Sequence, residues 1–173
     1  FSTVAQNLNT LLTVDLSAFY VDVTKDRMYT LNARSHERRS TQTAMYTICD
    51  GLARLLAPIL PVTADDLWRY MPGERGQCIH LEDFPEPARL VDSDLIGTWE
   101  RLLAVRETVN AAPEEKRKDK VIGNALGARV VITARGPVGT LLDSHRQHLP
   151  LLFNVSDVGV HVGQTEAMDD VHV

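Results

Sequence analysis

The sequence predicts a mainly α protein, an antiparallel helical bundle followed by a small α+β module. Three observations predict this fold. Apolar residues recur at helical spacing over most of residues 1–110, proline and glycine interrupt them at a few places, and β-branched runs appear only after residue 129. We therefore expect two domains: a bundle over residues 1–120, with an irregular connector at 73–92, and an α+β module over residues 121–173 with a frayed acidic tail.

Residues 1–30 contain neither glycine nor proline, which predicts one long helix or two abutting ones, with Asp15 as a candidate internal cap. Residues 31–36 are polar and break this helix, and Ser35 is a candidate N-cap for the next one. That next helix has the clearest periodicity in the chain. Its apolar face is formed by Thr41, Met45, Ile48, Leu52, Leu55 and Ile59.

The two prolines Pro58 and Pro61 are expected to end this helix, since each lacks an amide donor. A short helix capped by Thr63 should follow and stop at Pro72. Within the connector, residues 78–81 suit a brief extended segment.

Ser93 begins another amphipathic helix, which Pro113 should kink or break. We expect the bundle, residues 1–72 and 93–120, to bury a shared core. Its predicted members are Met45, Ile48, Leu52, Leu55, Leu67, Leu95, Trp99 and Leu102.

The last part of the chain has a different pattern. Residues 130–132 suit a strand, residues 138–148 look helical, and residues 151–155 and 158–162 are expected to be two further strands. In the last of these, valines alternate with other residues, which is typical of a half-buried strand.

Composition excludes several classes of protein. The formal net charge of -5 argues against indiscriminate nucleic-acid binding but allows a local basic face. Two cysteines without close spacing indicate a reduced, cytoplasmic protein. No apolar run is long enough to cross a bilayer, and the start at Phe1 suggests an excised fragment.

No catalytic site emerges from the motifs. The loop from Gly123 to Gly127 lacks the spacing of a phosphate-binding loop. His145, His148 and His161 have no cysteine or carboxylate cluster nearby to complete a zinc site. Cys49 lies in the amphipathic helix, where a structural thiol is expected. We predict no catalytic residue and no metal ligand.

The basic residues indicate a different function. Lys25, Arg27, Arg34, Arg38 and Arg39 crowd into one short stretch with His36 and Tyr29, and Trp68, Arg69 and Tyr70 follow on a later helix. Cations bind phosphates and flat rings stack on unpaired bases, as single-stranded RNA requires. The alternative from the residues alone is structural, with Trp68 and Tyr70 closing the bundle and the arginines pairing with Asp22 or Asp26.

Several segments resemble, in order, those of bacterial isoleucyl-tRNA synthetases, which are class I aminoacyl-tRNA synthetases. The most specific is Asp15–Thr30, DLSAFYVDVTKDRMYT. Arg38–Thr43 (RRSTQT), Leu55–Pro61 (LLAPILP), Asp66–Trp68 (DLW), Val105–Asn110 (VRETVN) and Lys120–Gly123 (KVIG) also match family segments. The resemblance covers the anticodon-binding region and its C-terminal junction.

The resemblance implies that the parent enzyme joins isoleucine to its tRNA with ATP and Mg²⁺, and that this region binds the anticodon stem-loop of tRNA(Ile) and adjoins the catalytic domain. The HIGH and KMSKS signatures are missing, as is the family's C-terminal zinc module with its paired CxxC motifs. We therefore expect this chain alone to be non-catalytic and without a cofactor.

Two alternatives stay open: a stand-alone helical module that binds a protein, and the equivalent domain of a valyl-tRNA synthetase. If the chain binds RNA, we expect two basic groups, one in residues 25–39 and the other in residues 68–75, to meet at one end of the bundle. The reason is that an antiparallel bundle brings alternate connections to the same end. The expected tRNA-binding residues are Lys25, Arg27, Arg38, Arg39, Trp68, Arg69 and Arg75.

Overall fold

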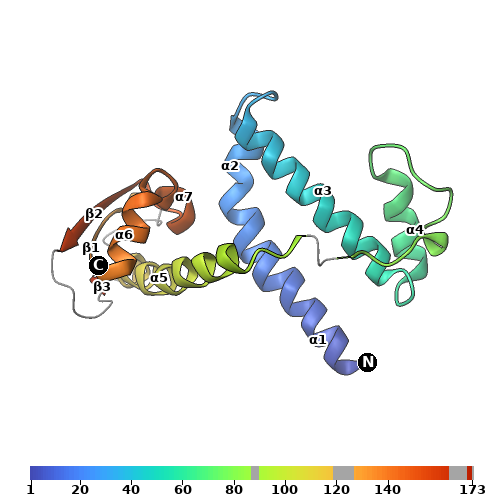
Figure 1. Ribbon diagram of the computed structural model, residues 1–173, viewed down its shortest axis with the longest axis horizontal. Coiled ribbons are helices and arrows are strands. Elements are labelled where there is room, and N and C mark those ends of the chain that lie inside the picture. The colour runs from blue at the N-terminus through green and yellow to red at the C-terminus, as the bar shows by residue number, and fades with distance from the viewer. Residues whose placement is uncertain (87–89, 119–126, 164–170, 173) are drawn as a thin grey trace. The chain divides into compact units, whose positions relative to one another are not determined.

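The computed structural model describes residues 1–86, 90–118, 127–163 and 171–172 (Figure 1). Contacts divide the chain into two compact units. One unit consists of Thr24–Val91, and the other combines Phe1–Val23 with Asp92–Val173. The structure is mainly helical with a small sheet, as predicted. The predicted domain boundary at residues 120 and 121 lies outside the described residues and stays a prediction.

Helical structure is continuous from residue 2 to residue 30, as predicted. It comprises α1 (Ser2–Thr10), a π-helical segment η1 (Leu11–Val21) and α2 (Asp22–Thr30). Asp15 lies inside η1, so the prediction of an internal cap was wrong. The helix does not restart there, and no backbone amide needs a new side-chain acceptor.

The unit Thr24–Val91 is built on α3 (His36–Leu56) and α4 (Pro61–Tyr70), with a short 3₁₀ turn η2 (Ile79–Leu81). The predicted cap at Ser35 is confirmed, since its side chain accepts a hydrogen bond from the amide of Arg38. Pro61 opens α4 at the first helical position, where its missing amide costs nothing. The helix therefore begins two residues before Thr63, and the predicted cap there was wrong. The predicted extended segment at residues 78–81 was also wrong, because most of it forms η2.

Small side chains form much of the core of this unit. Ala53 of α3 and Ala57, the residue that caps its C-terminus, pack with Ala64, Trp68 and Met71 of the α4 region and with Ile79. The predicted core was partly wrong, because Leu55 and Leu67 are exposed and Met45, Ile48 and Leu52 are only half-buried. The physical reason is that α3 turns its alanine face toward α4, where the indole of Trp68 fills the space beside small residues.

The other unit contains the long helix α5 (Ser93–Lys118). Its start is fixed by Asp92, whose carboxylate accepts hydrogen bonds from the amides of Asp94 and Leu95. The helix continues through Pro113, so a break there is ruled out, while the other predicted outcome, a kink, stays a prediction. A proline inside a helix removes one backbone donor and does not by itself end the helix.

A three-stranded sheet follows, with the order β2-β1-β3. Strands β1 (Arg129–Arg135) and β2 (Asp157–Gly163) are parallel and pair Ile132 with Val160, while β3 (Val171–His172) is antiparallel to β1. Between β1 and β2 the chain forms α6 (Gly136–Ser144), the 3₁₀ turn η5 (Arg146–His148) and α7 (Leu149–Phe153). The strands predicted at 130–132 and 158–162 are confirmed.

The strand predicted at residues 151–155 was wrong. Pro150 sits in the first turn of α7, and Asn154 ends that helix in the left-handed conformation, with φ 54°. A short apolar run does not distinguish a buried strand from a buried helical turn, so proline and asparagine decide here.

The core of this unit joins α5 to the sheet. Leu102, Val105 and Val109 of α5 are buried with residues from β1, β2, α6 and α7. Leu102 was predicted to be buried and is, but Trp99 and Leu95, about one and two turns earlier, are exposed. The predicted core was wrong at these two positions, because the part of α5 that packs into this core begins at Leu102.

Candidate nucleic-acid interface

The turn between α2 and α3 is held by local hydrogen bonds. The side chain of Asn32 accepts from the amide of Arg34 at 2.9 Å, and the backbone oxygen of Asn32 accepts from the amide of Ser35 at 3.0 Å. The guanidinium of Arg38 donates to the carbonyl of Leu31 at 2.9 Å. These bonds fix the backbone around Arg34 and place that side chain in solvent.

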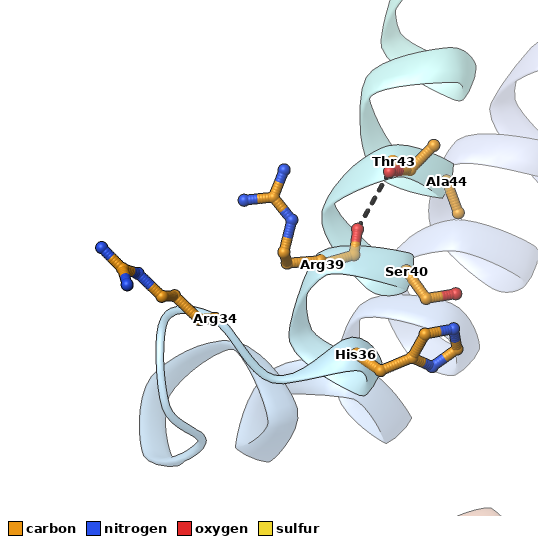
Figure 2. A pocket seen from close by; sticks show the side chains of 6 residues that line it. All are labelled: Arg34, His36, Arg39, Ser40, Thr43 and Ala44. Atoms are coloured by element: carbon orange, nitrogen blue, oxygen red, sulfur yellow. Dashed lines mark hydrogen bonds between the residues drawn. The ribbon is translucent and has the colours of Figure 1, made fainter.

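A surface pocket lies beside this turn, at the N-terminal half of α3. Figure 2 shows the guanidinium groups of Arg34 and Arg39 projecting toward the same side. The lining residues are Arg34, His36, Arg39, Ser40, Thr43 and Ala44. The lining therefore combines two permanent cations, an imidazole and two hydroxyl groups with no carboxylate among them. The Thr43 hydroxyl already donates to the carbonyl of Arg39 at 3.0 Å, so the two guanidinium groups are the main donors of the pocket, and they suit an anionic ligand, above all a phosphate oxygen.

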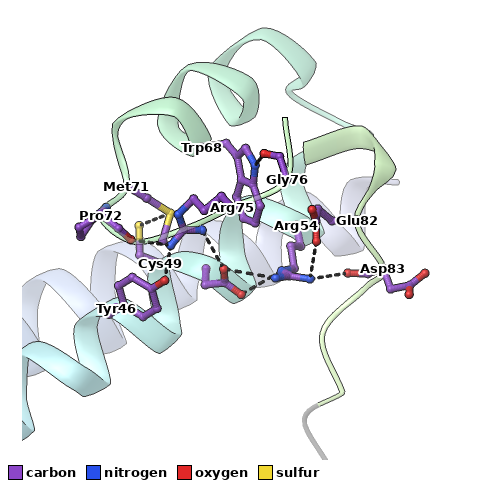
Figure 3. A network of polar contacts seen from close by, with 11 residues as sticks. Tyr46, Cys49, Arg54, Trp68, Met71, Pro72, Arg75, Gly76, Glu82 and Asp83 are labelled. Carbon is purple, nitrogen blue, oxygen red and sulfur yellow. Dashed lines mark hydrogen bonds and ion pairs between the residues drawn. The ribbon is translucent and has the colours of Figure 1, made fainter. Parts of the chain in front are cut away.

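A polar and aromatic network lies further along α3 (Figure 3). The guanidinium of Arg75 contacts Asp50 at 3.2 Å and lies 4.5 Å from the centroid of the Trp68 ring. Arg54 lies over the same ring at 5.3 Å and is paired with Asp50 at 2.9 Å. The indole N–H of Trp68 donates to the carbonyl of Gly76 at 2.9 Å. The network ties residues 75 and 76 of the connector to α3 and α4.

The predicted tRNA-binding residues fall into three groups by exposure: exposed, buried and half-buried. Arg39 and Arg69 are exposed, and Arg69 forms an ion pair with Asp65 at 2.6 Å. Trp68 is only 3% exposed, and the side chain of Arg75 is 8% exposed. Lys25, Arg27 and Arg38 are half-buried. Trp68 and Arg75 thus serve the packing of this unit.

The two basic groups do not gather at one pole as predicted. Arg38 and Arg39 lie in the first turn of α3, whereas Arg75 contacts Asp50, three turns later. The reason is helix length. At 1.5 Å per residue, α3 is roughly 31 Å long and α4 roughly 15 Å, so α4 returns only about halfway along α3.

Three residues of interest were missing from the set expected from sequence. Arg34 and His36 belong to the same basic stretch as Arg38 and Arg39, and this stretch was the signal that could have found them. Tyr46 contacts Arg75 across 29 positions, and nothing in the local sequence indicates that pairing.

Metal binding and membrane insertion find no support in the described part of the chain. Across residues 1–86, 90–118, 127–163 and 171–172, histidine, cysteine and acidic side chains form no group of three that could hold a metal ion. His145 instead lies at the end of α6, with its Nδ1 3.0 Å from the carbonyl of Leu141. Within the same residues, no helix combines the length and apolar character that a membrane span needs.

Comparison with known families identifies the class of this helical chain and its basic pocket. The model of the anticodon-binding domain of tRNA ligases matches residues 1–132. The chain belongs to this family. The match includes both the α2–α3 turn with its pocket and the network around Arg75.

Relatives narrow the class further. The chain is 43% identical to the isoleucine–tRNA ligase of Halalkalibacterium halodurans over 92% of its length. It is 40% identical to that of Syntrophotalea carbinolica over 99%, and 44% identical to that of Natranaerobius thermophilus over 84%. The resemblance to bacterial isoleucyl-tRNA synthetases is thereby confirmed, and the two alternatives are not favoured. The chain spans 17%, 18% and 16% of the length of these three relatives.

Proposed function

We propose that this chain binds the anticodon stem-loop of tRNA(Ile) through the pocket beside the α2–α3 turn. The observation that carries the proposal is the composition of that pocket, whose lining includes Arg34, Arg39 and His36 and no carboxylate. Each arginine can donate two parallel hydrogen bonds to a phosphate. Release of the counterions condensed on RNA then adds to affinity.

The surroundings of the pocket suit the same ligand. Tyr29 is 86% exposed at the end of α2, just before the turn, and offers a flat face for an unpaired base. Lys25 and Arg27 lie on the same helix. The net charge of -5 repels RNA in general, so a local basic surface confines binding to one place.

The seven residues expected from sequence enter this proposal in different roles. Arg39 contacts RNA directly. Lys25, Arg27 and Arg38 flank the turn, and Arg69 lies exposed on α4. Trp68 and Arg75 contribute through the network that fixes α4 and the connector on α3.

The parent protein is proposed to be a cytoplasmic isoleucine–tRNA ligase that uses ATP and Mg²⁺. In it, residues 1–72 and 93–120 form an antiparallel bundle next to the catalytic domain. Binding energy gained at the anticodon, far from the reacting groups, then helps to orient the acceptor end of the tRNA. The 173-residue chain alone should catalyse no isoleucine-dependent exchange between ATP and pyrophosphate, and exchange by the pure protein would contradict this assignment.

The binding proposal is tested by titrating the 173-residue chain into a fluorescently labelled tRNA(Ile) anticodon stem-loop, with anisotropy as the readout. Affinity should fall steeply between about 50 and 200 mM salt. A tRNA(Val) stem-loop of equal length serves as the control and should bind more weakly. If no binding is observed at low salt, or if affinity does not change with salt, the RNA interface is refuted. An apolar protein interface would show the second behaviour.

A further inference from the structure

One face of α3 connects the pocket to the network around Arg75. Arg39 and Tyr46 are seven residues apart, which is nearly two full helical turns, so their side chains leave the helix in almost the same direction. Along the axis they are separated by roughly 10 Å. Thr43, a lining residue of the pocket, lies between them. A nucleotide with its flanking phosphates can span such a separation.

Tyr46 is an exposed aromatic residue with a fixed ring. The guanidinium of Arg75 lies over the ring, 5.1 Å from its centroid, and donates a hydrogen bond to the tyrosine hydroxyl. Arg75 is itself held by Asp50 at 3.2 Å and by the carbonyl of Pro72 at 3.2 Å (Figure 3). One side of the ring is therefore covered, while 41% of the residue stays exposed.

A fixed, half-covered ring is well suited to stacking. An aromatic side chain that is already ordered loses little rotamer freedom when a ligand binds. The exposed tyrosines Tyr29 and Tyr70 leave most of their surface in solvent, at 86% and 87%, so ordering them costs more. Stacking needs only a flat face and therefore accepts any base.

We propose that Tyr46, backed by Arg75, is a stacking platform for an unpaired RNA base whose neighbouring phosphate lies in the pocket of Arg34 and Arg39. This inference rests on the proposed function and deepens it, because it assigns a base subsite next to the phosphate subsite. Arg75 acts here as a positioning residue, since it is too buried to bind RNA and sets the orientation of the ring.

The test separates base contacts from phosphate contacts. The full 173-residue chain is titrated with the tRNA(Ile) anticodon stem-loop and with the same RNA carrying abasic sites in the loop. Tyr46→Leu keeps apolar bulk on the helix and removes the flat ring, whereas Tyr46→Phe keeps the ring. We expect Tyr46→Leu to lower affinity for the intact loop about tenfold, to leave the abasic RNA unchanged and to keep the salt slope. Tyr46→Phe and Tyr46→Trp should both retain binding of the intact loop.

Arg39→Ala is the matched control, because it should weaken both RNAs and make the salt slope shallower. Helicity by circular dichroism shows that each variant folds, and Tyr46→Trp provides a second comparison that keeps the aromatic plane. The inference is overturned if Tyr46→Leu weakens both RNAs equally or leaves both unchanged. Failure of the wild-type chain to bind either RNA would instead overturn the proposed function and this inference with it.

Discussion

The guanidinium of Arg75 lies 4.5 Å from the centroid of the Trp68 ring, and both side chains are almost fully buried. Burying an arginine costs a great deal unless its charge is balanced. Here Asp50 supplies the balance at 3.2 Å, and the indole adds a favourable quadrupole. The pair therefore stabilises the unit Thr24–Val91 only together with its carboxylate.

The first prediction concerns this buried pair. Arg75→Met keeps much of the side-chain volume over Trp68 but leaves Asp50 with Arg54 as its remaining partner. We expect the variant to lower the free energy of unfolding by about 1–3 kcal/mol, less than for a carboxylate left with no partner. Urea denaturation followed by circular dichroism measures the change.

Arg69→Ala is the matched control for that variant. The Arg69 side chain is 67% exposed, and its pair with Asp65 spans one helical turn on the surface of α4. Such pairs contribute roughly 0–1 kcal/mol. Equal losses for the two variants would show that the Arg75 pair is no more important than a surface ion pair.

The second prediction concerns the close approach of α3 and α4. Ala53 is fully buried between these helices, and Leu52 beside it is only half-buried. Ala53→Leu should lower the free energy of unfolding by about 1–3 kcal/mol through overpacking. Leu52→Ala should cost less than the roughly 2–5 kcal/mol of a fully buried leucine. Thermal unfolding of both variants decides which face of α3 is packed, and a larger loss at Leu52 would contradict the alanine interface.

Sequence reasoning succeeded where a single residue type has one strong local effect. Ser35 caps α3, the same helix ends at Leu56 just before Pro58, and the alternating valines from Val158 to Val162 form a strand. It failed where packing decides between faces of the same helix. Alanine is only weakly apolar, so the periodicity of the larger side chains on α3 did not indicate Ala53 as a core residue. Small residues nevertheless allow the closest approach of two helices.

The candidate site shows the same limit. The basic stretch between Lys25 and Arg39 was visible in the sequence, and the structure places two of its arginines at one pocket. The burial of Arg75 could not be predicted, because its partners Asp50 and Tyr46 are 25 and 29 residues away. From the sequence alone, an arginine in an irregular connector is expected to be exposed, because the partners that bury it come from distant parts of the chain.

The third prediction concerns the unit that contains the sheet. Phe153 is about 1% exposed and packs in the same cluster as Val109 and Ile132. Phe153→Ala should lower the free energy of unfolding by about 3–5 kcal/mol, because the cavity it leaves is lined by apolar side chains. Leu95→Ala, at an exposed position of α5, should change it far less. Guanidinium denaturation of the two variants provides the comparison, and similar losses would show that the buried cluster is misplaced.

The last prediction separates two adjacent arginines of the α2–α3 turn. Arg39 is exposed and lines the pocket, and Arg38 donates to the carbonyl of Leu31 from a half-buried position. Arg39→Ala should weaken binding of the tRNA(Ile) stem-loop and reduce the slope of log affinity against log salt by about one, with little change in unfolding temperature.

Arg38→Ala should act mainly through the fold. Loss of the bond to Leu31 leaves a carbonyl at the end of α2 without this charged donor, so we expect a lower unfolding temperature and a stability loss of about 1–3 kcal/mol. RNA affinity should fall only as far as the turn loses its order, and the salt slope should stay near that of the wild type, because the guanidinium is engaged with the backbone. The reverse pattern would be a shallower salt slope in Arg38→Ala and a lower unfolding temperature in Arg39→Ala. It would show that Arg38 contacts the phosphate and Arg39 holds the turn, which contradicts the assignment of the phosphate contact to Arg39.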